Sequence, residues 1–266
     1  MLTELISRLI ASQHLRERSV CGQGNTAATI TREFSMPCVL GSSWMSLLGL
    51  SLIGLMLAPS LSGAGDLSAE EQAAGFHSLF DGKTLSGWTG ATEGYTVVDG
   101  AIQCLPDKGG NLLTEQDYGD FTLRLEFRLP PGGNNGVGIR APAMGHVATE
   151  GIEIQILDNT AEKYKTLAPY QYHGSVYGLI PARRGYLREV GVWNDQEITC
   201  VGRQITIRLN GTVIIEGNLD DALRDGAMDG KEHPGARRTT GRVGFLGHND
   251  PVAFRHIRIR EIPAGG

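Results

Sequence analysis

The sequence predicts an all-β fold in which short antiparallel strands form a sandwich or barrel. Three observations indicate this fold class: segments in which apolar and polar residues alternate, Asn-Gly and Asp-Gly turns between such segments, and 37 glycines among 266 residues. Alternation with a period of two is the pattern of a half-buried strand. Many short strands joined by tight turns are typical of sandwiches and barrels. The sequence shows no succession of strand and helix patterns, which argues against a doubly wound fold.

The N-terminal region has the pattern of a targeting segment. The apolar run LLGLSLIGLML at 47–57 is shorter than the roughly 20 apolar residues that a membrane-spanning helix needs. It suits the core of a signal peptide, and Ser62 and Ala64 then have the spacing of a cleavage site. We therefore expect residues 1–64 to be a leader and signal peptide, removed or disordered, with cleavage near Ala64 and Met36 as a plausible true start. The alternative is an uncleaved membrane anchor.

If residues 1–64 are a cleaved signal peptide, we expect the mature protein to be in the periplasm or outside the cell, with no stable membrane span. Its net charge of −5 gives no basic surface for nucleic acid. Export permits a disulfide between Cys104 and Cys200, but two lone cysteines on separate predicted strands do not demand one. No Cys/His spacing typical of a metal site is present.

Residues 65–75 are expected to be a linker with a short helix, because Ser68 and Glu71 have the spacing of a capping box. The β domain should follow at 76–262. Its clearest strand is FTLRLEFRL at 121–129, which alternates throughout. The turns Asn210-Gly211 and Asp99-Gly100 predict hairpins, because both residues of such a turn adopt positive φ. Further strands are predicted at VGIRA, GIEIQIL, RVGFLG and FRHIRIREI, and a turn or two of helix at NLDDALRDG.

The strand GIEIQIL is the main candidate for a functional surface. Its isoleucines occupy one face and Glu153 and Gln155 the other. In the preceding strand, Gly136, Gly138 and Arg140 share a face. If the two strands pair through the loop 141–150, Arg140 should lie beside Glu153 or Gln155, and the glycines should leave space for a sugar ring. The alternative is an ordinary solvated sheet face.

Other polar groups could extend this surface. Glu126 and Arg128 alternate on the strand 121–129, and His248 lies in a loop beside Asn249 and Asp250. The long loop 161–188 carries five tyrosines, which either bind a ligand or pack with the hydroxyl at the rim: Tyr164, Tyr170, Tyr172, Tyr177 and Tyr186. Four further side chains could bind calcium through oxygen, or they could form hydrogen bonds within turns. They are Asp158, Asn159, Asn249 and Asp250.

An ordered set of motifs resembles the 3-keto-disaccharide hydrolase domain family across about residues 76–262. The motifs are SLFDGKTLSGW, YGDFTLRLEFRL, GNNGVGIR, GIEIQILDN, VYGLIP, VGVWN and GRVGFLGHNDPVAFRHIRIREI. The resemblance implies a concanavalin A-like jelly-roll sandwich of two antiparallel sheets, with the ligand on the concave sheet. It also implies cleavage of a carbohydrate substrate, a glycoside already oxidised at C3 by a separate oxidoreductase.

The resemblance also marks individual residues. The asparagine-rich turn and arginine strand of the family match Asn134, Asn135 and Arg140. The Glu-x-Gln-x-x-Asp strand matches Glu153, Gln155 and Asp158, and the histidine-aspartate loop matches His248 and Asp250. The Gly-Glu-Trp-Asn element is altered here to Gly191, Val192, Trp193 and Asn194, so that no glutamate is present at that point.

Chemistry on a 3-keto-glycoside requires a base for the C2 proton, a donor for the enolate and an acid for the leaving oxygen. We assign Glu153 as the base, Arg140 or His248 as the group that steadies the enolate, and Asp158 or His248 as the group that serves the leaving oxygen. No metal or cofactor is expected, with calcium left open. The expected substrate-binding residues are Asn135, Gln155, Glu126, Tyr172, Tyr177 and Asp250.

Two other functions fit the same sequence. The fold would also serve a carbohydrate-binding module without catalysis. An ordinary β-glucanase-like glycosidase would use two carboxylates, for which Glu153 and Asp158 are the candidates. The amide of Gln155 between them argues against this third option.

Overall fold

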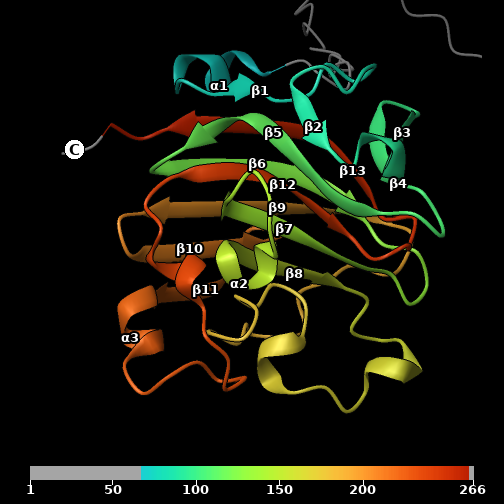
Figure 1. Cartoon of the computed structure of the whole chain (residues 1–266). Helices are drawn as coiled ribbons and strands as arrows, with labels where there is room; N and C mark the ends of the chain where they lie inside the picture. Colours follow the sequence, from blue (N-terminus) through green and yellow to red (C-terminus); the bar gives the residue numbers. More distant parts are fainter. Residues whose placement is uncertain (1–66, 264–266) are drawn as a thin grey trace, which may run out of the picture. The chain divides into compact units, whose positions relative to one another are not determined.

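The structure, a computed structural model, describes residues 67–263 and consists mainly of strands in two antiparallel sheets (Figure 1). The predicted signal peptide lies outside the described residues. One sheet has eight strands, in the order β11-β10-β9-β6-β13-β4-β3 with β1 also paired to β13, and the other has five, in the order β2-β5-β12-β7-β8. This arrangement confirms the predicted sandwich.

The bounds of the strands follow from the backbone pairing. The eight-stranded sheet contains β1 (His77–Ser78), β3 (Tyr95–Val98), β4 (Ala101–Cys104), β6 (Phe121–Arg128), β9 (Trp193–Val201), β10 (Gln204–Leu209), β11 (Thr212–Asn218) and β13 (Ala253–Glu261). The five-stranded sheet contains β2 (Trp88–Gly90), β5 (Gly110–Tyr118), β7 (Asn134–Ala141), β8 (Ile152–Leu157) and β12 (Gly241–Gly247).

The helices in the described part of the chain are short. They are α1 (Ala69–Ala73), α2 (Val147–Glu150) and α3 (Leu219–Leu223), with single 3₁₀ turns η1 (Thr92–Gly94), η2 (Glu162–Tyr164), η3 (Pro169–Gln171) and η4 (Pro234–Arg237). The predicted capping box is confirmed, because the Ser68 side chain accepts from the Glu71 N–H and the Glu71 carboxylate accepts from the Ser68 N–H. No helix within residues 67–263 is both long and apolar enough to cross a membrane.

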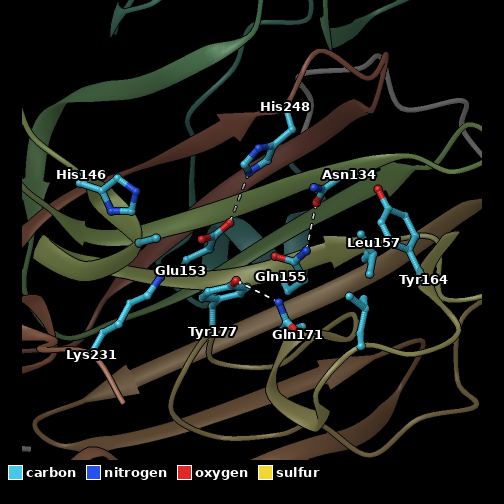
Figure 2. A pocket seen from close by; sticks show the side chains of 12 residues that line it. Asn134, His146, Glu153, Gln155, Leu157, Tyr164, Gln171, Tyr177, Lys231 and His248 are labelled. Carbon is cyan, nitrogen blue, oxygen red and sulfur yellow. Dashed lines mark hydrogen bonds and ion pairs between the residues drawn. The ribbon is translucent and has the colours of Figure 1, made fainter. Parts of the chain in front are cut away.

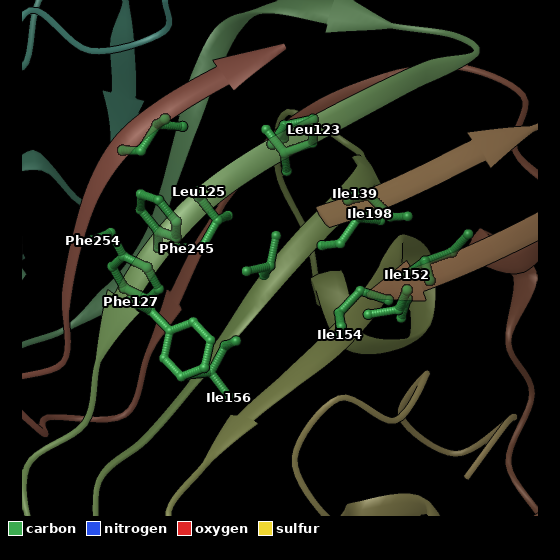
Figure 3. Close-up of a cluster of buried hydrophobic side chains, with 14 of the residues drawn as sticks. Leu123, Leu125, Phe127, Ile139, Ile152, Ile154, Ile156, Ile198, Phe245 and Phe254 are labelled. Carbon is green, nitrogen blue, oxygen red and sulfur yellow. The ribbon is translucent and has the colours of Figure 1, made fainter. Parts of the chain in front are cut away.

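The core lies between the two sheets and is built by the alternation seen in the sequence (Figure 3). Phe127 of β6 and Ile154 of β8 are fully buried, and the rings of Phe245 and Phe254, one from each sheet, stack with centroids 3.8 Å apart. Each buried side chain of this size stabilises the fold by roughly 1.5–3 kcal/mol. Cys104 and Cys200 are both buried and unbonded.

Both predicted hairpins are present. Asp99 and Gly100 join β3 to β4, and Asn210 and Gly211 join β10 to β11, all four with positive φ. β8 is the last strand of its sheet, and its free edge would be open to unwanted pairing. The chain following β8 returns along that edge, where Val176 forms a bridge with Ile154. This return covers the edge and brings loop side chains beside those of β8.

Candidate active site

A cavity of about 260 Å³ lies on the outer face of the five-stranded sheet, over β7 and β8 (Figure 2). Its walls come from these strands and from the loops that follow β7, β8, α3 and β12. It is lined by Asn134, His146, Ala148, Glu153, Gln155, Leu157, Tyr164, Leu167, Gln171, Tyr177, Lys231 and His248. Among these lining residues, Glu153 is the single carboxylate and it lies among three basic side chains. The cavity is therefore suited to a neutral or electron-rich ligand.

Glu153 is held in the cavity with little contact to water. The residue is 5% exposed, and burial raises the pKa of its carboxyl to about 7. Its Oε1 atom has no hydrogen-bond partner within the described residues. Burial disfavours the charged form of a carboxyl, so Glu153 exchanges its proton close to neutral pH. That is the range in which a general base or acid is most effective.

Two glycines of β7 shape the floor of the cavity. A Cβ atom on Gly136 would lie 2.3 Å from Glu153 Oε1, so glycine is needed for the carboxylate to lie flat over the strand. A Cβ atom on Gly138 would lie 2.9 Å from Val147 Cγ1 of α2. The prediction that these glycines leave space for a sugar ring was wrong, because the Glu153 side chain and α2 occupy that space.

His248 faces Glu153 from the end of β12. Gly244 of β12 pairs with Gly138, which in turn pairs with Glu153, so the side chain four residues after Gly244 falls on the same face of the sheet. His248 Nε2 lies 4.0 Å from Glu153 Oε1 (Figure 2). Partial burial lowers the pKa of His248, while the nearby Asp250 carboxylate acts in the opposite direction. The imidazole is therefore mostly neutral at neutral pH.

Tyr177 enters the cavity because the returning chain pairs with β8. Its N–H donates to the Glu153 carbonyl at 2.9 Å, which places the two side chains next to each other on one face. The hydroxyl of Tyr177 accepts a hydrogen bond from Gln171 Nε2 at 3.2 Å. Two of the five loop tyrosines, Tyr164 and Tyr177, line the cavity.

Amide side chains form the opposite wall. Gln155 Nε2 donates to Asn134 Oδ1 at 3.0 Å, and both residues line the cavity. Asn135, the predicted binding residue, is fully buried on the opposite face of β7. That prediction was wrong by one position, since Asn134 rather than Asn135 shares the face of Gly136 and Gly138. Asp250 does not line the cavity. Its carboxylate accepts a hydrogen bond from the Asn134 N–H at 3.0 Å and so positions the first residue of β7.

Arg140 lies outside the site, contrary to prediction. It is fully buried, and its guanidinium donates to the carbonyls of Gly202 and Arg238 and to the Asp120 carboxylate. The reason is a β-bulge at the end of β7, where Arg140 has a φ of 47° and the register with β12 shifts. A bulge reverses the expected side-chain direction, so Arg140 holds together turns at one end of the sandwich.

Glu126 and Tyr172 are also misplaced by the prediction. Glu126 lies on β6, in the eight-stranded sheet, where Arg255 Nε donates to it and His256 Nδ1 lies 3.0 Å away. Tyr172 is buried beneath the loop, and its hydroxyl donates to the Lys165 carbonyl at 3.1 Å. Neither residue lines the cavity.

Asp158 holds a turn instead of facing the cavity. Its carboxylate accepts from the Gly132 N–H and from the N–H and hydroxyl of Thr160. Burial would raise the pKa of this carboxyl, but these hydrogen bonds outweigh it and hold the pKa below its usual value. A two-carboxylate glycosidase site built on Glu153 and Asp158 is therefore not formed, and Asp158 is not placed to serve a leaving group.

Three of the four side chains considered for calcium, Asp158, Asn159 and Asp250, accept hydrogen bonds from the protein. The Asn159 side-chain carbonyl accepts from the His173 N–H, and Asp250 accepts from Asn134. Within residues 67–263, no three His, Cys, Asp or Glu side chains are grouped as metal ligands.

Sequence reasoning missed several cavity residues. Asn134 was matched to the asparagine-rich turn of the family but was not predicted to bind substrate, although its parity with Gly136 indicates the face that carries the cavity. His146 and Lys231 lie in irregular loops before α2 and after α3, where no periodicity indicates the direction of a side chain. Gln171 precedes Tyr172, which was predicted to bind substrate. The place of Gln171 in the cavity depends on how the loop folds onto β8, which the sequence does not indicate.

Residues 75–260 match the family model described as a 3-keto-alpha-glucoside-1,2-lyase-like domain. A 3-keto-disaccharide hydrolase of Bacteroides thetaiotaomicron is 26% identical over 230 residues, a match that covers 71% of this chain and 79% of that protein.

Two solved structures from Parabacteroides distasonis, each described provisionally as a glycosyl hydrolase, have a similar fold. One has a TM-score of 0.63 at 28% identity and covers 70% of this chain and 99% of its own. The other has a TM-score of 0.66 at 23% identity and covers 75% of this chain and 99% of its own. The fold found here is therefore shared with crystallographically determined proteins.

Proposed function

Because this chain belongs to the family of 3-keto-alpha-glucoside-1,2-lyase-like domains, we propose that it cleaves 3-keto-glycosides by elimination followed by hydration. The similarity to a 3-keto-disaccharide hydrolase supports this substrate class. The ketone at C3 is introduced beforehand by a separate oxidoreductase. The leader predicted at 1–64 would carry the enzyme to the periplasm or out of the cell.

The C3 ketone determines the chemistry. It acidifies the proton on C2, because the electrons left by that proton delocalise into an enolate. In the proposed reaction, the Glu153 carboxylate takes the C2 proton, the C1–O bond breaks, and the aglycone leaves with a proton as an alcohol. The sugar is left with a C1–C2 double bond. One water then adds across this bond, with hydroxide at C1 and a proton at C2, to give the 3-keto-sugar.

One observation carries the assignment of the base: Glu153 is the sole carboxylate lining the cavity, and its Oε1 makes no hydrogen bond within the described chain. An oxygen free of hydrogen bonds can accept a proton from carbon without first losing a partner. The limited exposure of Glu153 to water further strengthens it as a base relative to an ordinary carboxylate.

The remaining wall supplies groups for the negative charge that develops. His248 lies opposite Glu153, and its neutral imidazole can donate a hydrogen bond to the enolate oxygen. Lys231 adds a positive charge to the same cavity. Donors that are fixed before the reaction stabilise such an oxyanion more effectively than mobile water does. His248 and Lys231 thus replace Arg140 in the role first assigned to it.

The direct test is turnover of a chemically prepared 3-keto-disaccharide and of methyl 3-keto-α-glucoside by the purified protein, with and without a chelator. We expect release of the 3-keto-sugar or its unsaturated precursor, and a loss of at least about 10²-fold in kcat/KM for Glu153→Gln. Glu126→Gln is the matched control and should keep full activity, since Glu126 lies on the other sheet. Full activity of Glu153→Gln would overturn the assignment. Saturable glycan binding without turnover by the unmodified protein would show a binding module instead.

A further inference from the structure

The hydrogen-bond directions around Gln171 determine where the proton of Tyr177 points. Gln171 Oε1 accepts from the Ala168 N–H at 3.0 Å. A backbone N–H can only donate, so the atom facing it must be the amide oxygen and the other amide atom must be nitrogen. That nitrogen, Nε2, lies 3.2 Å from the Tyr177 hydroxyl. An amide nitrogen can only donate, so Tyr177 accepts in this bond.

The hydroxyl proton of Tyr177 is consequently free. Within residues 67–263, the hydrogen bond from Gln171 is the one bond that this hydroxyl makes, and the residue lines the cavity next to Glu153. Figure 2 shows the Tyr177 ring next to Glu153, with a dashed line from its hydroxyl to Gln171. The Tyr177 ring also packs against the ring of Tyr170, with centroids 5.9 Å apart in a T-shaped arrangement.

We propose that Tyr177 is the acid that protonates the leaving oxygen. The inference rests on the proposed function and adds the proton donor that the elimination still lacks. Asp158 cannot take this role because it is tied into a turn, and His248 is assigned to the enolate. A phenol is a stronger acid than the alcohol that leaves, so transfer of its proton to that oxygen is favourable.

The proton balance closes over the two steps. In the elimination, Glu153 gains the C2 proton while Tyr177 gives its own to the C1 oxygen as the C1–O bond breaks. In the hydration, the Tyr177 phenolate takes a proton from water as hydroxide adds to C1, and the Glu153 carboxylic acid returns a proton to C2. Both residues end in their starting states, and the net reaction consumes one water for each glycoside cleaved.

An acid is needed only where the leaving oxygen is strongly basic, which provides the test. The kcat/KM of wild type and Tyr177→Phe would be measured on methyl and 4-nitrophenyl 3-keto-α-glucosides. We expect a loss of about 10²–10⁴-fold on the methyl glucoside and less than about tenfold on the nitrophenyl glucoside, whose leaving group departs without a proton. Tyr170→Phe is the matched control, because it removes a hydroxyl from the neighbouring ring outside the cavity lining.

A second variant tests the direction of the hydrogen bond. Gln171→Glu keeps an acceptor for the Ala168 N–H but presents a second acceptor to Tyr177, which draws the phenol proton away from the cavity. We expect the same dependence on leaving group as for Tyr177→Phe, without loss of thermal stability. Equal losses on both substrates, or no loss on either, would overturn the role of Tyr177 while leaving the proposed function intact. Failure of wild type on both substrates would overturn the proposed function itself.

Discussion

At the scale of single residues, the site depends on one carboxyl that the fold keeps from water. Glu153 and Glu126 are both glutamates on strands, yet the fold moves their pKa values in opposite directions. Burial raises the pKa of Glu153 to about 7. For Glu126, burial acts upward, but hydrogen bonds and attraction from His256 and Arg255 outweigh it and bring the pKa to about 2. Two carboxyls whose pKa values differ in this way are suited to different roles, and Glu153, with the raised pKa, is the candidate for proton transfer.

The raised pKa of Glu153 should cost stability at neutral pH. In the unfolded chain the carboxyl titrates near its usual value of 4.5, and in the folded protein near 7. Between these values the folded state binds more protons, so the free energy of unfolding falls as pH rises through the window. Across the whole window, the free energy of unfolding falls by on the order of 3 kcal/mol.

We therefore expect Glu153→Gln to raise the melting temperature above neutral pH and to change it little at about pH 4, where the carboxyl is protonated in both states. Thermal unfolding across this pH range measures the effect. Glu115→Gln on the exposed face of β5 is the control and should change the melting temperature at neither pH. A variant that is less stable than wild type above neutral pH would contradict the raised pKa.

At the scale of elements, β7 governs the site through its glycines and its bulge. The strand lies between β12 and β8, so it fixes the separation of His248 and Glu153. Gly136 lets the Glu153 side chain lie against the strand, while the bulge at Arg140 ends the regular pairing and turns the guanidinium toward the end of the sandwich.

Gly136→Ala should reduce activity by displacing the carboxylate. The new methyl group would lie 2.3 Å from Oε1, and the side chain must move toward the open cavity. A displacement of about 1 Å costs roughly 10²-fold in rate, and better hydration should shift the rising limb of the pH–rate profile to lower pH. Steady-state kinetics measures both effects. Gly119→Ala, where a Cβ meets only ordinary contacts, should leave both unchanged; an unaltered Gly136→Ala enzyme would refute this role of the glycine.

Arg140→Met should affect folding and leave the chemistry intact. The change removes the donor to two carbonyls and to the Asp120 carboxylate, and unpaired buried groups cost about 3 kcal/mol in total. Chemical denaturation measures the loss of stability, and kcat/KM of the folded protein should stay within about twofold. Arg242→Met, which breaks a contact of 3.9 Å with the half-exposed Asp117, should cost less than about 1 kcal/mol. Loss of activity in folded Arg140→Met would return Arg140 to the site.

The alternation of residues predicted β6, β7, β8, β12 and β13, and the Asn-Gly and Asp-Gly turns predicted the two hairpins, because these signals are local in sequence. The strands β5 and β9 were not predicted, and the pairing of β7 with β8 was assumed from the loop that joins them. The alternation correctly placed Glu153 and Gln155 on the outer face. It failed at Arg140 because a bulge shifts parity without a sequence signal, and at Glu126 because the assignment of strands to sheets depends on contacts distant in sequence. Lys231 was missed because an irregular loop has no period from which to infer direction.

At the scale of the whole molecule, the outer faces of the two sheets have different roles. The eight-stranded sheet carries paired charges on its outer face, such as Glu126 with Arg255 and Arg124 with Glu197. The five-stranded sheet carries the cavity, and the loops that follow β8 and α3 close over it. The core between the sheets buries the inner faces of β7 and β8, which support Glu153 from below. Activity should therefore be sensitive to changes on one outer face and tolerant of changes on the other.

The central claim is that Glu153 removes a proton from C2. The most direct measurement compares methyl 3-keto-α-glucoside carrying hydrogen or deuterium at C2, with kcat/KM followed for the wild-type protein and the sugar product examined by mass after rapid quenching. We predict a primary isotope effect and an unsaturated sugar that has lost the C2 deuterium, with neither product nor isotope effect detectable for Glu153→Gln. An unchanged rate with deuterium fully retained in the 3-keto-sugar would contradict the account and indicate direct displacement at C1.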